Sequence, residues 1–159
     1  MSTQTPTFRS VSIDPRGPRF TAAVTALVLA VVLLTAPSGL ATALLGVQAA
    51  LFAVGAVLGV QHTPLGWVFR TVVRPRLGAP DELEDAAPPR FAQGVGLVFT
   101  TVALVGFLSG ATTVGLVATG FALVAALLNA VLGLCLGCEM YLLIRRALPE
   151  VEVRKRTSA

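Results

Sequence analysis

Residues 91–138 read FAQGVGLVFTTVALVGFLSGATTVGLVATGFALVAALLNAVLGLCLGC and contain no Asp, Glu, Lys, Arg or His. This stretch of roughly 50 residues is too long for one membrane-spanning helix of about 20 residues, and it suits two helices joined by a tight turn. The turn is expected at Ser109-Gly110-Ala111-Thr112, because Gly and Ser are typical turn residues. The stretch therefore predicts a helical hairpin with spans at about 91–108 and 112–134.

A second uncharged stretch lies earlier in the chain. Between Arg19 and Arg70 the only ionisable side chain is that of His62, and Ala36-Pro37-Ser38-Gly39 provides a turn near the middle. This stretch predicts another helical hairpin. Its spans are expected at about 20–36 and 40–60.

The composition of the whole chain supports this interpretation. Of its 159 residues 55% are hydrophobic and only 13% are charged, whereas a soluble domain carries about a quarter charged residues. These values exclude a disordered chain, a disulfide-rich secreted miniprotein and an ordinary soluble enzyme. We predict an all-α, polytopic membrane protein with four transmembrane helices as two tandem helical hairpins. Residues 1–159 form a single membrane domain, with flexible tails at about 1–12 and 147–159.

The 12 basic residues are confined to three parts of the chain, and neither hairpin turn contains one. They are Arg9, Arg16 and Arg19 before the first span, Arg70, Arg74, Arg76 and Arg90 between the hairpins, and Arg145, Arg146, Arg154, Lys155 and Arg156 after the last span. The positive-inside rule places all of them, and both termini, in the cytoplasm. Ala41-Thr42-Ala43 resembles a signal-peptidase site, but Asp14 in a long leading segment favours an uncleaved span.

The two halves of the chain resemble each other at a constant offset of 71 residues. Asp14 recurs as Asp85, Pro18-Arg19-Phe20 as Pro89-Arg90-Phe91, Ser38-Gly39 as Ser109-Gly110 and Leu65-Gly66 as Leu136-Gly137. We interpret these matches as an internal duplication with repeat units at about 14–66 and 85–137. Units of two spans share one orientation, so a pseudo-twofold axis would run along the membrane normal. The alternative is that all helical hairpins look alike.

Seven residues near the starts of the first and third spans are expected to act as structural anchors. They are Asp14, Pro18, Arg19, Phe20, Pro89, Arg90 and Phe91. The prolines suit the first helical turn. The arginines would extend to lipid headgroups, and the phenylalanines would lie at the membrane boundary. Asp14 and Asp85 would pair with these arginines or with the positive end of a helix; a paired carboxylate site is the alternative.

The loop between the hairpins predicts a short interfacial amphipathic helix. Thr63-Pro64 is a typical helix start, and the apolar residues after it recur at helical spacing. Trp67 would lie at headgroup level, and Pro75 is expected to end the helix.

Cys135-Leu136-Gly137-Cys138 is the motif with the clearest chemistry. We predict a redox-active pair at the inner boundary of the membrane. The pair is expected toward the C-terminal end of the fourth helix, where the helix dipole opposes a thiolate. A break at Gly133 or Gly137 would remove that objection. The alternatives are a metal site and small residues used for helix packing.

The metal alternative combines both cysteines with His62, which leaves the second span at a similar depth. Glu139 or Asp14 would complete a site of four ligands. No cofactor is indicated by the sequence. The polar residues inside the spans include no carboxylate, Lys or Arg, which argues against a proton-coupled pump. They are Gln48, Gln93, Thr100, Thr101 and Asn129.

Several motifs together resemble a known family. They are Ile13-Asp14-Pro15-Arg16-Gly17-Pro18-Arg19-Phe20, Val73-Arg74-Pro75-Arg76, Pro89-Arg90-Phe91, Asn129 and Cys135-Leu136-Gly137-Cys138-Glu139-Met140-Tyr141. Over roughly residues 12 to 146 the chain resembles the bacterial membrane family known as domain of unknown function 4395. The resemblance implies a four-span protein of the bacterial inner membrane and supplies no activity. The arrangement is also distantly similar to DoxX-like four-helix membrane proteins, an analogy of fold alone.

The leading functional prediction is an accessory of thiol or sulfur redox metabolism. Cys135 and Cys138 would exchange with a cytoplasmic thioredoxin-like or sulfurtransferase partner. One alternative is a transporter or channel for a small, sulfur-containing solute, and another is a structural or assembly subunit without chemistry. Whether the protein is an enzyme stays open. Besides the lipid bilayer, a homo-oligomer is a candidate partner. Nucleic acid is not expected, because no aromatic residues alternate with the basic ones.

Overall fold

The computed structural model describes residues 11–148 of the chain. Within this range four helices are long and apolar enough to cross a membrane, which confirms the four predicted spans. They are α1 (Arg16–Thr35), α2 (Gly39–Leu58), α5 (Ala87–Leu108) and α6 (Thr112–Leu127), which is continued by a π-helical turn, Leu128–Leu132. Most of each predicted tail (residues 1–10 and 149–159) lies outside the described residues, whereas Ser12 and Ala147 belong to regular elements.

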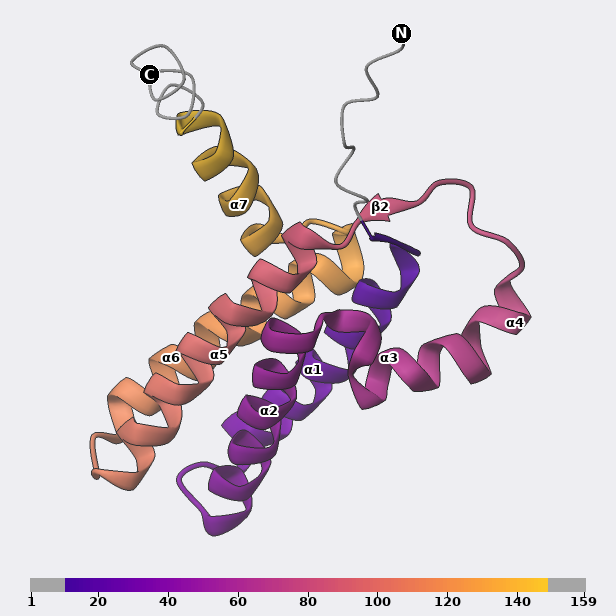
Figure 1. Cartoon of the computed structure of the whole chain (residues 1–159). Coiled ribbons are helices and arrows are strands. Elements are labelled where there is room, and N and C mark those ends of the chain that lie inside the picture. Colours follow the sequence, from indigo (N-terminus) through magenta and orange to yellow (C-terminus); the bar gives the residue numbers. More distant parts are fainter. Residues whose placement is uncertain (1–10, 149–159) are drawn as a thin grey trace, which may run out of the picture.

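Shorter elements gather at one end of the helical bundle. They are β1 (Ser12–Ile13), a 3₁₀ turn (Val60–His62), α3 (Pro64–Val68), a π-helical turn (Phe69–Val73), α4 (Arg74–Leu77), β2 (Glu84–Asp85) and α7 (Leu136–Ala147). In Figure 1 the two short loops, α1–α2 and α5–α6, lie at the opposite end of the bundle. We call that end the turn end, and the end that carries α3 and α7 the cysteine end.

Asp14, predicted as an anchor, and its repeat equivalent Asp85 hydrogen-bond to the starts of α1 and α5 in the same way. The backbone N–H of Arg16 donates to Asp14 Oδ1 at 2.9 Å, and that of Ala87 donates to Asp85 Oδ1 at 2.9 Å. Each carboxylate therefore lies at the positive end of a helix, and Asp14 Oδ2 also lies 3.9 Å from Arg74 Nε. Because each helix starts at this cap, α1 and α5 begin about a turn earlier than expected.

A short strand pair, which the sequence patterns did not predict, joins the starts of α1 and α5. β1 and β2 are antiparallel, with Ser12 opposite Asp85 and Ile13 opposite Glu84. The backbone N–H of Ala86 extends the pairing by donating to the carbonyl oxygen of Val11 at 2.9 Å.

The four long helices form a closed ring. α1 packs against α2 and α6, and α5 packs against the same two helices. The hydrophobic core fills the half of the ring nearer the turn end. Its buried residues are Leu29, Val32, Ala41, Leu45, Ala103, Phe107, Ala118 and Ala122.

Glycines set the closest helix approaches. A Cβ on Gly106 would lie 2.7 Å from the backbone nitrogen of Gly115, so the α5 and α6 backbones meet there. A Cβ on Gly55 would lie 2.6 Å from Gln93 Oε1, so the Gln93 side chain of α5 packs directly against the α2 backbone. The bundle therefore depends on the absence of side chains at these points.

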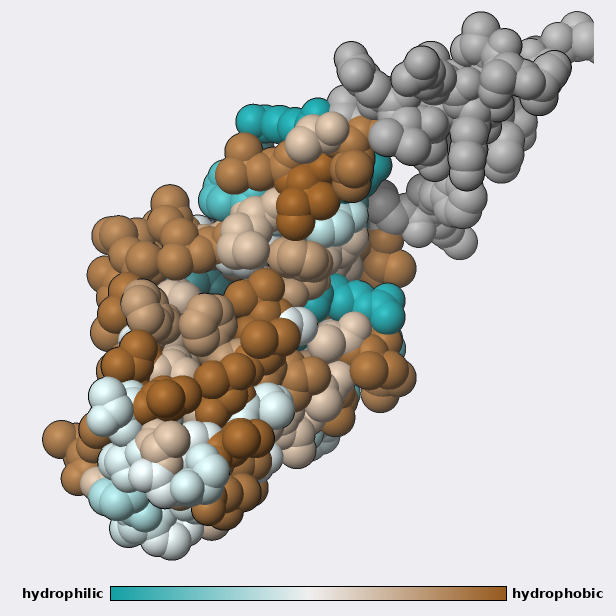
Figure 2. Space-filling model, turned by 90° about the vertical axis from the view of Figure 1, so that its left-hand side faces the viewer, coloured by the Kyte–Doolittle hydropathy of each residue, from teal (hydrophilic) through white to brown (hydrophobic). Residues whose placement is uncertain are grey.

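The outer surface of the bundle is apolar. Figure 2 shows hydrophobic residues over most of one face, with the strongly hydrophilic ones toward the cysteine end. Leu27, Val47, Val98 and Phe121 are among the large apolar side chains that are exposed. An exposed apolar belt of this size is expected for helices that face lipid.

The segment after α2 begins as predicted and ends later. Thr63 Oγ1 accepts a hydrogen bond from the Gly66 N–H at 3.0 Å and so caps α3. The prediction that Pro75 ends this segment is wrong, since α4 runs to Leu77 and is followed by Gly78 with a φ of 74°. Pro75 lies in the first turn of α4, where its missing N–H is tolerated.

Candidate functional site

The helical conformation is interrupted between α6 and α7. The π-helical turn ends at Gly133, which has a φ of 69° in the left-handed region, and Leu134 N–H donates to the Leu128 carbonyl at 3.2 Å. Cys135 is extended, and α7 begins at Leu136. The cysteines therefore do not lie toward the C-terminal end of the fourth helix, and the break considered at Gly133 is present. Because glycine adopts positive φ without strain, Gly133 stops the helix before the motif.

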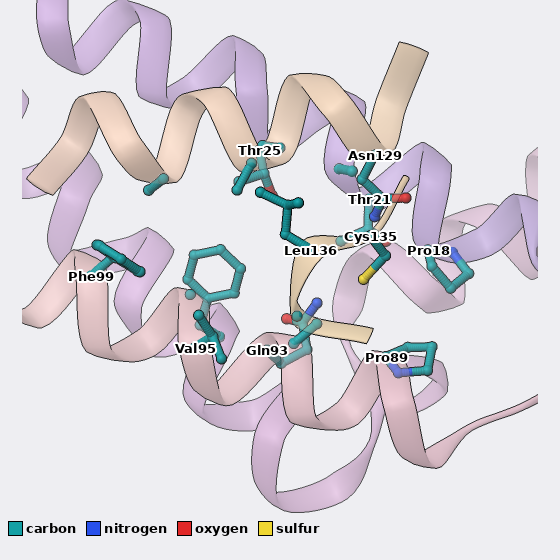
Figure 3. Close-up of a pocket in the computed structure, with 18 of the residues that line it drawn as sticks. Pro18, Thr21, Thr25, Pro89, Gln93, Val95, Phe99, Asn129, Cys135 and Leu136 are labelled. Atoms are coloured by element: carbon teal, nitrogen blue, oxygen red, sulfur yellow. The ribbon is translucent and has the colours of Figure 1, made fainter. Parts of the chain in front are cut away.

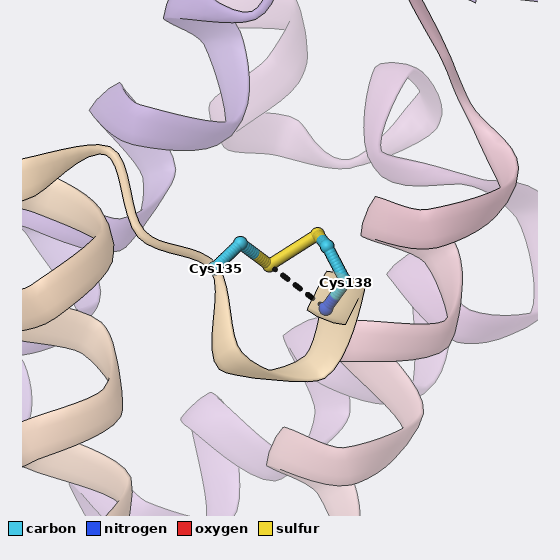
Figure 4. The surroundings of a disulfide bond; sticks show 2 residues. All are labelled: Cys135 and Cys138. Atoms are coloured by element: carbon cyan, nitrogen blue, oxygen red, sulfur yellow. Dashed lines mark hydrogen bonds between the residues drawn. A yellow bond between two sulfur atoms is a disulfide. The ribbon is translucent and has the colours of Figure 1, made fainter. Parts of the chain in front are cut away.

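Cys135 and Cys138 are joined by a disulfide across the first turn of α7 (Figure 4). Cys135 is the N-cap residue, and its Sγ accepts a hydrogen bond from the Cys138 backbone N–H at 3.3 Å. A helix N-terminus offers free N–H groups and a positive dipole end. These favour a thiolate at Cys135 when the disulfide is reduced. The helix dipole therefore does not oppose a thiolate at Cys135, as it would at the C-terminal end of a helix.

α7 is held against the start of α5. A Cβ on Gly137 would lie 2.6 Å from the Cα of Ala92, so the two helix backbones are in direct contact. Farther along α7 the Tyr141 ring lies 5.7 Å from the Phe91 ring, and the Arg145 guanidinium lies 5.9 Å from the Tyr141 ring centre. Phe91, predicted as a membrane anchor, is therefore one of the residues that position the disulfide.

A cavity of about 260 Å³ lies between the four long helices at the cysteine end. Figure 3 shows Cys135 and Asn129 near Pro18 and Pro89, with Phe99 farther along the bundle. The cavity exists because alanines replace larger side chains where the helices face one another. These are Ala22, Ala92, Ala122, Ala125 and Ala126.

The polar side chains in the cavity come from three helical segments. Thr21 and Thr25 lie on α1, Gln93 on α5, and Asn129 on the π-helical turn after α6. Thr25 Oγ1 accepts a hydrogen bond from Gln48 Nε2 at 3.3 Å. Thr21 Oγ1 is buried without a hydrogen-bond partner among the described residues. The cavity therefore offers hydrogen-bonding groups in an apolar setting.

Arg19 and Arg90, two of the predicted anchors, hydrogen-bond to the ends of helices. Arg90, near the start of α5, donates from Nε to the Ala56 carbonyl at 2.7 Å and from Nη2 to the Val57 carbonyl at 2.6 Å. Arg19, near the start of α1, donates to the Val131 carbonyl at 3.4 Å. Each arginine thus binds carbonyl groups that a helix of the other hairpin leaves unpaired.

We expect Arg90→Met to lower the free energy of unfolding by about 1.5 kcal/mol, because two charge-assisted hydrogen bonds to the end of α2 are lost. Thermal unfolding of the protein purified in detergent measures the loss. Arg70→Met is the matched control, since Arg70 is exposed and forms no ion pair within the described part of the chain. Equal stability of the two variants would contradict the capping role.

The structure does not bring His62 into the cysteine site. His62 Nδ1 donates to the Leu58 carbonyl at 2.7 Å in the turn after α2. Among residues 11–148, no three His, Cys, Asp or Glu side chains are grouped as metal ligands. The combination of His62, Cys135 and Cys138 considered from the sequence is therefore not assembled here.

Sequence reasoning missed Thr21 and the alanine face of α6. The signal that could have found that face is the spacing of Ala122, Ala125, Ala126 and Asn129, which places four small or polar residues on one side of a helix. Thr21 carries no comparable signal, since a threonine in a span usually bonds its own helix backbone.

Comparisons with known proteins identify a family for the chain. No curated protein and no solved structure matches the chain. The family model described as Domain of unknown function (DUF4395) matches residues 13–146, which include every long helix and the cysteine pair. The chain therefore belongs to the DUF4395 family.

Proposed function

We propose that this protein is a membrane accessory of thiol or sulfur redox metabolism. Its working group would be the Cys135–Cys138 pair, cycling between disulfide and dithiol. The observation that carries the proposal is the position of Cys135 as the N-cap of α7, with its Sγ bonded to the Cys138 N–H. This setting stabilises the thiolate, which is the form of cysteine that attacks disulfides.

The proposed partner is a thioredoxin-like or sulfurtransferase protein. A thiolate of the partner attacks one sulfur of the pair, forms a mixed disulfide and releases the other cysteine. A second partner thiol then completes the transfer of two electrons and two protons. Arginines at the cysteine end would attract an acidic docking surface. Those within the described residues are Arg16, Arg19, Arg70, Arg74, Arg76, Arg90, Arg145 and Arg146.

The proposal includes an orientation in the membrane. All basic residues of the described chain lie at the cysteine end, so the positive-inside rule would place that end in the cytoplasm of a bacterium. α3 and α4 project sideways from the bundle in Figure 1, and Trp67 is 59% exposed. This geometry supports a helix lying in the inner membrane interface.

An internal duplication is also part of the proposal. Ile13 pairs with Glu84, and the two residues are separated by the repeat offset of 71. Asp14 and Asp85 form equivalent helix caps, and Arg19 and Arg90 bind equivalent helix ends. The chain would then be two tandem helical hairpins related by a pseudo-twofold axis.

The two alternative functions, a transporter or channel and a structural subunit, require different properties of the bundle and of the cysteines. A transport pathway along the bundle axis requires the core at the turn end to open, since Leu29 and Leu45 are fully buried there. Uptake of small sulfur compounds into proteoliposomes would measure such transport. A structural subunit requires no thiol chemistry, so it would tolerate the loss of both cysteines.

A membrane-impermeant maleimide tests the thiol proposal. In inverted vesicles we expect no labelling before reduction and two labels per chain afterward, because both thiols become free and face the cytoplasm. Cys135→Ser or Cys138→Ser should each leave one labelled thiol, and the double variant none. With Cys138→Ser, Cys135 should react at a pH where an ordinary cysteine is still protonated.

Cysteines that stay unlabelled both with and without reductant would rule out the redox role. Labelling in right-side-out vesicles would overturn the orientation and leave the thiol chemistry standing. Full cellular function of the double serine variant would favour the structural subunit.

A further inference from the structure

The cavity beside Cys135 has the features of a ligand site. It borders the hydrophobic core on the side of the cysteine end, and Ala122 belongs to both. Leu136 and Met140 line it and are 40% and 46% exposed, so the cavity opens to the surroundings beside α7. A ligand could therefore enter from the side of the bundle at the depth of the disulfide.

The lining specifies the chemistry of that ligand. No lining residue carries a charged side chain, so the ligand is neutral. Thr21 is only 6% exposed, and its Oγ1 has no hydrogen-bond partner among the described residues, although an unpaired buried hydroxyl is costly. The amides of Gln93 and Asn129 add donors from two other segments. Hydroxyl and amide groups in an otherwise apolar lining fit a neutral, apolar molecule that carries carbonyl oxygens as hydrogen-bond acceptors.

We propose that the cavity binds a lipid-soluble quinone and that the reduced cysteine pair transfers its electrons to it. This inference rests on the proposed thiol function. A cavity of about 150 Å³ holds a benzene molecule, so the larger cavity here accommodates a substituted quinone ring. The hydrocarbon tail of the quinone leaves between Leu136 and Met140 toward the lipid.

The dithiol supplies the two electrons and two protons that reduce one quinone to a quinol. Cys135 lines the cavity and Cys138 does not, so Cys135 is the cysteine that meets the ring. Its thiolate bonds to a ring carbon, and the Cys138 thiolate then attacks Cys135 Sγ. The electron pair of the sulfur–carbon bond stays with the ring. The two protons from the thiols go to the two quinone oxygens, and the products are one disulfide and one quinol.

The test uses the purified, full-length protein in lipid nanodiscs, reduced and freed of reductant. The probe is decylubiquinone, whose fully substituted ring disfavours stable thiol adducts. We expect one quinone reduced per disulfide formed, followed by quinone absorbance and by maleimide labelling of the remaining thiols. The double variant Cys135→Ser, Cys138→Ser should reduce none.

Two substitutions test whether the cavity is the site. Ala126→Phe fills it and should slow quinone reduction about tenfold or more. Ala23→Phe, at an exposed position of α1, is the matched control and should have no effect. Thr21→Val keeps the shape and removes one hydroxyl, so it should raise the KM for quinone about fivefold. Its control is Thr101→Val, at an exposed position of α5.

A parallel measurement separates this inference from the proposed function. Reduced thioredoxin should still open the disulfide of Ala126→Phe at the normal rate, because only the cavity is filled. If the unmodified protein exchanges with thioredoxin but reduces no quinone, the quinone inference is wrong and the thiol function stands. If the pair is inert toward both, both proposals fail. Equal quinone reduction by Ala126→Phe and the unmodified protein would place the reaction outside the cavity and overturn the inference.

Discussion

Gly137→Val is expected to move α7 off α5 and to abolish quinone reduction while the four-helix bundle stays folded. The first side-chain atom of any residue at this position would lie 2.6 Å from the Cα of Ala92. Backbone atoms within a helix cannot yield as a flexible side chain can, so α7 must shift and carry the disulfide with it. Quinone reduction in nanodiscs measures the loss, and thermal unfolding measures the bundle.

The matched control for this variant is Ala147→Val. It places a valine at an exposed position of the same helix and should change neither quantity. In the Cys138→Ser background, Gly137→Val should also let Cys135 react faster with a bulky maleimide, because the thiol is displaced from the cavity. Normal quinone reduction by the Gly137→Val protein would show that the contact with Ala92 does not position the site.

Gly106→Val is expected to be the most destabilising substitution in the bundle. A Cβ there would lie 2.7 Å from the nitrogen and 3.1 Å from the Cα of Gly115, so two helix backbones would have to separate. Overpacking typically costs about 1–3 kcal/mol, and contact with backbone favours the upper end. Since total stability is only about 5–15 kcal/mol, we expect a markedly lower melting temperature in detergent.

Gly94→Val provides a control in the same helix. No atom lies within 4 Å of a Cβ placed on Gly94, so the added side chain has open space. The two variants share composition and helix propensity changes. A similar melting temperature for both would show that the close approach of α5 and α6 contributes nothing.

The long helices could be predicted because the membrane imposes simple requirements. A helix that crosses lipid needs about 20 apolar residues, and charged side chains are excluded from it. The stretch from Phe91 to Cys138 meets both conditions twice. Helix starts were less accurate, because Asp14 and Asp85 cap the helices through local hydrogen bonds that hydropathy does not register.

The helix break at Gly133, which makes Cys135 the N-cap of α7, was harder to predict. Gly133 was recognised as a potential break, but a glycine inside an apolar helix is usually tolerated. Cysteine is not among the preferred N-cap residues, so Cys135 gave no sign that a new helix starts there. The cavity was out of reach for another reason. It depends on how alanines from separate helices face one another, and that is a property of the packing.

The arginine bonds between the hairpins have a consequence for the order of events during synthesis. When α2 is complete, the carbonyls of Ala56 and Val57 still lack their partner, since Arg90 has not yet been translated. Arg19 is already present when the carbonyl of Val131 emerges. The end of α2 must therefore wait without its cap, whereas the end of α6 meets its cap as soon as it is made. Translation past Arg90 is the point at which the end of α2 can first be capped, and the bundle can close only after α6 and Val131 have followed.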